Sequence, residues 1–253
     1  MLFEALALNE ELSGRESQRS RHQLFNWWRN WLLQHTPATD ANERLLQLID
    51  LVYHELAFSG NWKDFFNSQN VYLDTMIEQR LGTSASLALL VSYFAHKLDL
   101  PCDVINLPGC FVLRFILDDD CYFDPFTGEQ LTLREVELKL RGYKGDLARL
   151  TGDHLRALEQ PEVMVRWLSA LKSALIREDQ FEGALRVSET LLQFNPDDPH
   201  EMRDRGFLFQ QLDCANVAIH DYEYFIEKCP RDPVADLLKI QIRSLEQEPS
   251  TLH

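Results

Sequence analysis

Cys110 is the side chain whose position first suggests chemistry. It follows Pro108 and Gly109 and precedes the apolar run 111–117, so it stands at the start of a predicted strand. A thiol in this place can be a nucleophile or a small buried residue. Because no basic partner lies nearby in the sequence, we favour the buried residue.

A buried helix and a hairpin would position this thiol. Thr83 or Ser84 is the expected cap of an apolar helix over residues 84–97, which follows a helix ended by Gly82. After Pro101 the apolar period changes to two, and the runs 111–117 and 122–126 flank the turn 118–120. The pattern predicts a helix packed on a small antiparallel sheet.

The residues before this helix have a helical pattern as well. Apolar residues recur at three and four residue intervals in LFNWWRNWLL and in ERLLQLIDLVYHEL, and Asp40 precedes the second run as a cap. Trp27 and Trp31 are one helical turn apart, which favours burial against the next helix.

The last third of the chain contains an internal repeat. Pro196 and Pro230 are thirty-four residues apart, as are the pairs Pro199 and Pro233, and Ala184 and Ala218. This period is that of the tetratricopeptide repeat, whose helix pairs stack to bury their apolar faces. Lys172 stands where a small residue is usual, and residues 234–245 are expected to form a closing helix.

The order of motifs resembles a known core. Arg80-Leu81-Gly82, the capped helix, Leu100-Pro101, Pro108-Gly109 and Asp124-Pro125 resemble the transglutaminase-like cysteine hydrolases. With the repeats behind it, the chain resembles the bacterial SirB/YchA family from about residue 41 onward. The resemblance implies an α+β, mostly helical fold with a papain-like core and an α-α repeat array. The expected domains are a helical extension (1–40), the transglutaminase-like domain (41–160) and two repeats with the closing helix (161–253).

The same resemblance implies where a catalytic triad would lie. Active relatives carry Cys at the helix start, His at the first hairpin strand and Asp on the next strand, and the matching positions here are Ser84, Cys110 and Asp124. A thiol is a poor general base for a serine, and no His occurs between His96 and His154. We therefore expect a degenerate, silent triad. The alternative is a serine or cysteine hydrolase or acyltransferase with an unconventional base from elsewhere, such as His54 or His154.

Each triad position also has a structural interpretation. Ser84 is expected to cap the helix, and the Asp124 carboxylate to bond a backbone N–H two residues on, with Arg114 as a further neighbour. The acidic run 118–120 is expected to be a solvated turn rather than a calcium loop.

One face of the repeats offers a candidate binding surface. It carries three arginines, one Phe and polar neighbours: Arg166, Arg177, Arg203, Phe207 and Gln210, with Ser169, Ser173, His200 and Gln211. In an acidic chain such a face would attract an acidic or carboxylate-ended protein segment. The alternative is that the repeats only support the first domain.

Composition narrows the class of function. A formal charge of -15 and a pI near 4.9 disfavour nucleic-acid and membrane-surface binding. The start of the sequence lacks a signal-peptide pattern, and five cysteines without CxxC spacing are expected to be reduced thiols rather than disulfides or metal ligands. We expect a cytoplasmic, non-catalytic scaffold that needs no cofactor and binds a protein or peptide, with a structural subunit as another possibility.

Overall fold

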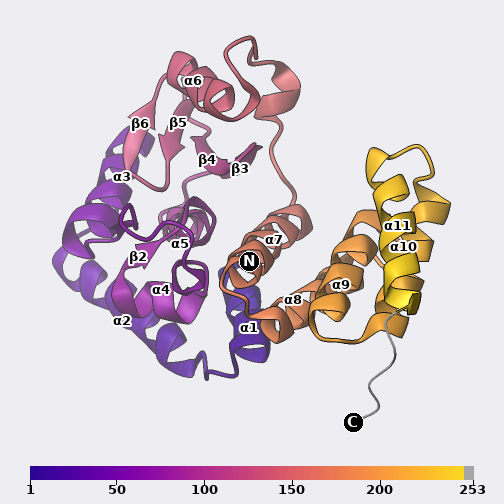
Figure 1. Ribbon diagram of the computed structural model, residues 1–253. Coiled ribbons are helices and arrows are strands. Elements are labelled where there is room, and N and C mark those ends of the chain that lie inside the picture. Colours follow the sequence, from indigo (N-terminus) through magenta and orange to yellow (C-terminus); the bar gives the residue numbers. More distant parts are fainter. Residues whose placement is uncertain (248–253) are drawn as a thin grey trace. The chain divides into compact units, whose positions relative to one another are not determined.

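The chain forms two compact units. The computed structural model describes residues 1–247 and divides after Trp167, so that the first unit is Met1–Trp167 and the second begins at Leu168 (Figure 1). The fold is α+β and mostly helical, as predicted. Within the described residues, every helix is too short or too polar to cross a lipid bilayer.

Helices form the first part of the first unit. They are α1 (Leu2–Ser13), α2 (Gln18–Gln34) and α3 (Ala41–Ile49), which continues into a π-helical turn, η1 (Asp50–Glu55). Asp40 caps α3 as predicted, because its carboxylate accepts the Glu43 N–H at 3.0 Å. Trp31 is buried, in agreement with its apolar spacing.

The segment before the buried helix differs from the prediction in one respect. The short turn η2 (Ser68–Asn70) leads into α4 (Leu73–Gln79), which ends where Arg80 adopts a left-handed conformation with φ of 61°. Gly82 was expected to end this helix but belongs to β2 (Leu81–Gly82), which pairs in parallel with β1 (Ser59–Gly60).

The buried helix has the predicted bounds. α5 (Ser84–Lys97) begins after Thr83, whose hydroxyl accepts the Ser86 N–H while the Ser86 hydroxyl accepts the Thr83 N–H in a capping box. Most of its residues are buried, since it is apolar on most faces.

A four-stranded antiparallel sheet lies between α5 and α6 (Figure 1). Its order is β3 (Cys102–Leu107), β4 (Cys110–Phe115), β5 (Cys121–Asp124) and β6 (Glu129–Leu131), and α6 (Leu133–Lys144) follows. Leu107 pairs with Cys110 across the turn between β3 and β4. Gly109 in this turn has a φ of 85°, which a glycine can adopt without backbone strain. The predicted hairpin is confirmed as β4 and β5, whereas β6 was not predicted.

Trp167 closes the first unit. After the short turn η3 (Gly152–Leu155), α7 (Gln160–Arg177) begins, and the Trp167 indole N–H donates to the Val71 carbonyl at 2.9 Å. Both residues are buried, so this bond satisfies two polar groups inside the core.

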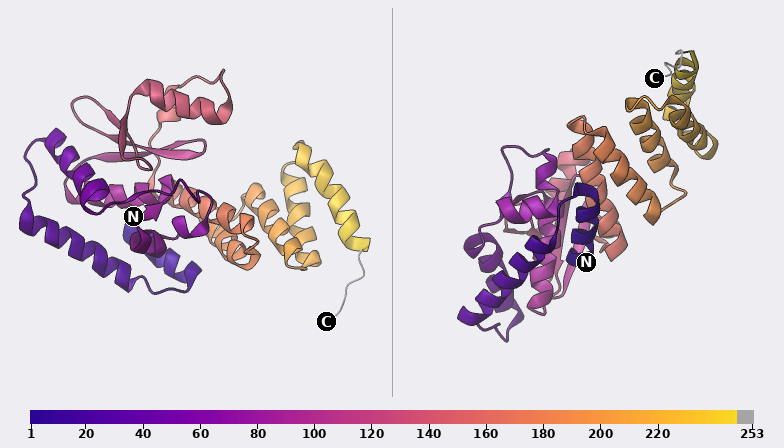
Figure 2. Two further views of the ribbon diagram at one scale, coloured as in Figure 1. Left: turned by 60° about the vertical axis from the view of Figure 1, so that its left-hand side comes forward. Right: turned by 90° about the horizontal axis from the view of Figure 1, so that it is seen from below.

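The second unit is a row of antiparallel helices (Figure 2). After the end of α7 come α8 (Phe181–Phe194), α9 (Pro199–Gln211), α10 (Ala215–Lys228) and α11 (Pro233–Gln247). α8 and α10 begin thirty-four residues apart, and so do α9 and α11. These spacings confirm the repeat that was predicted from the proline positions. The closing helix α11 extends slightly beyond the predicted residues 234–245 at both ends.

Candidate functional site

Ser84 links the start of α5 to the strand that carries Cys110. Its Oγ accepts a hydrogen bond from the Phe111 N–H at 3.2 Å, and Ser84 is 9% exposed. Of the two expected caps of α5, Thr83 is the one that the structure shows, so the expectation that Ser84 caps the helix is wrong. Ser84 is instead the first helical residue, and its hydroxyl ties the helix to the amide next to Cys110.

The Cys110 thiol is mostly withdrawn from water. Burial raises the pKa of Cys110 to about 11; the charge of Lys139 opposes this rise and that of Asp124 adds to it. Because only the thiolate is a strong nucleophile, this thiol is protonated and weakly reactive at neutral pH.

Asp124 lies at the end of β5 and is 3% exposed. Its Oδ1 accepts the Phe126 N–H at 2.9 Å, which confirms the predicted turn, and its Oδ2 pairs with the Lys139 Nζ at 2.5 Å. The Arg114 side chain was the expected neighbour but pairs with Asp103, its partner across the β3–β4 ladder. A buried carboxylate needs such a countercharge, and here α6 supplies it.

Lys139 is the residue that the sequence reasoning missed. It lies on α6 between Val136 and Leu140, both fully buried, and these two side chains turn that side of the helix toward the sheet. Their spacing was a usable signal for the face of α6, but nothing in the sequence connected residue 139 with Asp124.

Tyr53 packs beside the same carboxylate. Its hydroxyl donates to the Pro125 carbonyl at 2.9 Å, and burial, followed by the charge of Asp124, raises the pKa of Tyr53. The phenol therefore stays neutral and holds the chain directly after β5.

The histidines considered as distant bases, His54 and His154, form no hydrogen bond with the triad positions in the described part of the chain. Within residues 1–247, no imidazole hydrogen-bonds to Ser84 or Cys110. His154 accepts the Thr151 N–H through Nδ1 at 3.2 Å, and His54 lies in the π-helical turn η1. In the same described range, no three His, Cys, Asp or Glu side chains are arranged to hold a metal ion.

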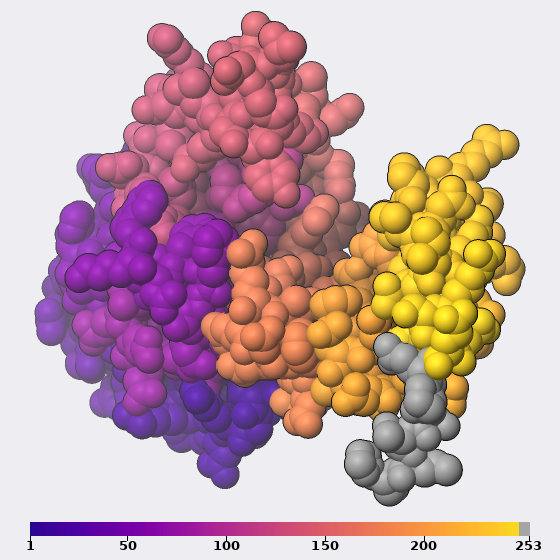
Figure 3. All heavy atoms as spheres, viewed as in Figure 1, coloured from indigo at the N-terminus to yellow at the C-terminus, as the bar shows by residue number. Residues whose placement is uncertain are grey.

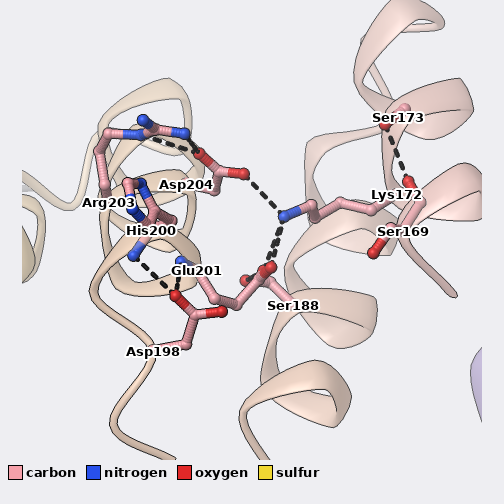
Figure 4. Close-up of polar contacts among 9 residues, drawn as sticks. All are labelled: Ser169, Lys172, Ser173, Ser188, Asp198, His200, Glu201, Arg203 and Asp204. Carbon is pink, nitrogen blue, oxygen red and sulfur yellow. Dashed lines mark hydrogen bonds and ion pairs between the residues drawn. The ribbon is translucent and has the colours of Figure 1, made fainter. Parts of the chain in front are cut away.

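In the repeat unit, Lys172 is the centre of a buried ionic cluster (Figure 4). Its Nζ reaches from α7 to both oxygens of Glu201 at 2.8 and 2.7 Å and to Asp204 at 2.9 Å. The Ser188 hydroxyl donates to Glu201 at 2.5 Å. Burial would raise the pKa of Asp204, but Lys172 and Arg203 outweigh it and hold that pKa below its usual value.

The predicted binding residues of the repeats differ in accessibility. Phe207 is 38% exposed and contacts the Phe181 ring edge-on, whereas the Arg203 side chain is only 29% exposed. Arg203 pairs with Asp204 at 2.7 Å and lies over the Phe225 ring, so its charge is largely matched within the protein.

The remaining predicted binding residues are Gln210, Arg177 and Arg166, and they differ in their contacts. The Gln210 side chain accepts the Tyr222 hydroxyl at 2.9 Å. Arg177 is exposed at the end of α7. Arg166, also exposed, belongs to the first unit, where its guanidinium lies 3.2 Å from the amide of Asn106.

Comparisons with known proteins agree with this two-part architecture. Residues 16–169 match the transglutaminase-like superfamily, and residues 171–243 match the tetratricopeptide repeat. A UPF0162 protein of Vibrio cholerae is 39% identical over 98% of this chain and 94% of its own length. Protein SirB1 of Salmonella typhimurium is 37% identical over 84% of this chain and 80% of its own length. YchA of Escherichia coli K12 is 37% identical, with 83% and 79% covered. No solved structure matches the chain.

Proposed function

Because the chain belongs to the transglutaminase-like superfamily and, within it, to the family of SirB1 and YchA, we propose that it is a non-catalytic scaffold protein. Its role is to bind a protein or peptide partner in the bacterial cytoplasm and so to regulate it. The repeats support this role, since tetratricopeptide arrays offer extended surfaces for other proteins.

The ion pair between Lys139 and Asp124 is the observation that carries the non-catalytic part. In an active triad the third carboxylate orients a histidine, whereas here it is neutralised by a lysine at 2.5 Å. The raised pKa of Cys110 supports the same conclusion, because its thiol stays protonated at neutral pH and, within residues 1–247, no imidazole hydrogen-bonds to Ser84.

The partner segment that we propose for the repeats is acidic. Phe207 and Arg177 are both exposed in the repeat unit, and an aromatic ring and a guanidinium are groups that a carboxylate-bearing segment can contact. Arg203 and Gln210 contribute less, because both are less exposed than Arg177 and Phe207. A formal charge of -15 favours a protein partner over nucleic acid or an anionic membrane surface.

Affinity capture with the full chain tests the binding role. We expect partners held by the wild type to be lost in Arg177→Glu, and retained in Arg231→Glu, which reverses another exposed arginine of the repeat unit. Capture that both variants leave intact would remove the acidic-segment proposal.

Turnover assays test the non-catalytic part. The full chain is incubated with activated esters, with and without an amine acceptor, beside Ser84→Ala and Cys110→Ala. We expect the three proteins to give the same background rate. A wild-type rate that either substitution abolishes would overturn the proposal.

The alternative is a hydrolase or acyltransferase that uses Lys139 in place of histidine. It is favoured by one observation, that the Lys139 Nζ lies 2.5 Å from Asp124, which occupies the third position of the triad. If this alternative holds, Lys139→Met must remove an activity that Lys144→Met keeps.

A further inference from the structure

The closing helix α11 has two apolar faces. The inner one packs toward α10 through Leu238, Ile242 and Leu245, and Ala235 is buried as well. On the outer side, Leu237 and Ile240 are 65% and 66% exposed. They are three residues apart and therefore lie on one face of the helix. Figure 3 shows α11 in yellow at the end of the repeat unit.

The thirty-four residue repeat shows which residues of α9 are equivalent to this outer face of α11. Thirty-four residues before Leu237 and Ile240 stand Arg203 and Gly206 of α9. Arg203 lies over the Phe225 ring of α10. A Cβ atom on Gly206 would stand 2.9 Å from Tyr222 of α10. Both positions thus contact the second helix of their own repeat.

α11 is the first helix of a repeat, and within residues 1–247 it is also the last helix. A helix that ends an array needs a polar outer face to stay soluble. Two neighbouring aliphatic side chains, each about two-thirds exposed, do not fit that requirement. They fit the face on which a second helix packs.

The size of Ile240 indicates which kind of helix fits. In the second repeat the small Gly206 faces the large Tyr222. In the first repeat the equivalent residues are the large Lys172 and the small Ser188, which both bind Glu201. A large residue at the position of Ile240 therefore calls for a small residue opposite, as in α8.

We propose that the outer face of α11, formed by Leu237 and Ile240, is a docking site for an amphipathic helix of a partner protein. This helix takes the place that a second helix holds in a complete repeat. Its contact face resembles that of α8, with small residues four apart and an aliphatic residue three further on, as Ala184, Ser188 and Leu191 are arranged. A second copy of this chain is the less suitable occupant, since two chains of charge -15 repel each other.

This inference rests on the proposed binding role and specifies the partner and its place. The probe that tests it is a labelled peptide with the sequence of residues 181–194, because α8 supplies the fitting face. A short helix is marginal in water, so a lactam between Glu182 and the lysine of Arg186→Lys, both exposed positions, holds the peptide helical. Fluorescence anisotropy follows its binding to the full chain.

We expect saturable binding that Leu237→Glu and Ile240→Glu each weaken by about tenfold or more, which corresponds to about 1.4 kcal/mol. Val217→Glu on α10 and Leu147→Glu in the first unit are the controls, since both residues are exposed and apolar but lie elsewhere. They should leave binding unchanged. A peptide with Ser188→Tyr should bind weakly to the wild type and better to Ile240→Ala, which makes room for the ring.

Three results would overturn the inference. The first is a peptide that does not bind saturably, and the second is binding that neither glutamate variant weakens. The third is a dimer in sedimentation experiments that Leu237→Glu dissociates, because a second copy is then the occupant. If partners are still captured in Ile240→Glu while the peptide fails to bind, the scaffold role stands and only this site falls.

Discussion

Gly206 and Tyr222 are in such close contact that a Cβ atom added to Gly206 would stand 2.9 Å from the tyrosine ring. The ring has little freedom to retreat, because its hydroxyl is bonded to Gln210 at 2.9 Å. In the preceding repeat the same two positions hold Lys172 and Ser188. At these two equivalent positions the large and the small residue are therefore exchanged between the repeats.

Gly206→Ala should lower the free energy of unfolding by about 1–3 kcal/mol, because the added methyl group overpacks against Tyr222. Gly206→Leu should cost more. Gly183→Ala is the matched control: a Cβ there would meet Leu175 at an ordinary 3.5 Å, so the helix should be unaffected or gain up to about 1 kcal/mol. Urea unfolding measures both, and equal effects at the two glycines would contradict the packing account.

Lys172→Met should destabilise the protein by about 3–5 kcal/mol, since it leaves the largely buried Glu201 without its countercharge. Adding Glu201→Gln should recover part of that loss, which a double-mutant cycle measures. The exposed pair of Lys239 and Asp236 gives the contrast, and Lys239→Met should cost far less than Lys172→Met. Additive losses at Lys172 and Glu201 would mean that the two side chains do not stabilise each other.

Acid should weaken the repeat unit through Asp204. Its pKa lies below the usual 3.8 in the folded protein, so its stabilising contribution is complete above that value and is lost as the pH falls through the lower folded pKa. The unfolding free energies of wild type and Asp204→Asn should therefore differ at neutral pH, and this difference should shrink as the pH falls below 3.8. A constant difference down to pH 2 would show that this carboxylate does not titrate as described.

The Cys110 thiol should react slowly with iodoacetamide at neutral pH. With a pKa of about 11, its thiolate fraction increases about tenfold for each pH unit up to that value, and its alkylation rate should follow. The exposed Cys214 serves as the reference thiol in the same sample. Peptide mapping by mass spectrometry gives both rates, and faster labelling of Cys110 than of Cys214 at pH 7.5 would contradict its withdrawn state.

The regular parts of the fold were predictable from local periodicity. The bounds of α5, the β4–β5 hairpin and the thirty-four residue repeat follow from apolar spacing and proline positions. The pairing of β1 with β2 was not, because two-residue strands carry no periodic signal. The left-handed Arg80 was missed for a similar reason, since Gly82 was the more probable helix end on residue type alone.

Partners of charged side chains were the least predictable part of the site. Arg203 was expected to lie on the candidate binding face of the repeats. Its contacts with Asp204 and Phe225 mean that a reversed charge there also destabilises α9 and α10. The pairing of Asp124 with Lys139 likewise depends on how α6 packs on the sheet, which the sequence of either segment does not contain.

The indole of Trp167 determines where the chain can be shortened. A fragment that ends before residue 167 loses the donor to the Val71 carbonyl and leaves that buried oxygen unpaired, as well as a large void in the core. A fragment that ends directly after residue 167 stops inside α7 and exposes a severed helix end. Recombinant forms of the first unit therefore need the whole of α7, through Arg177, to fold as that unit does in the intact chain.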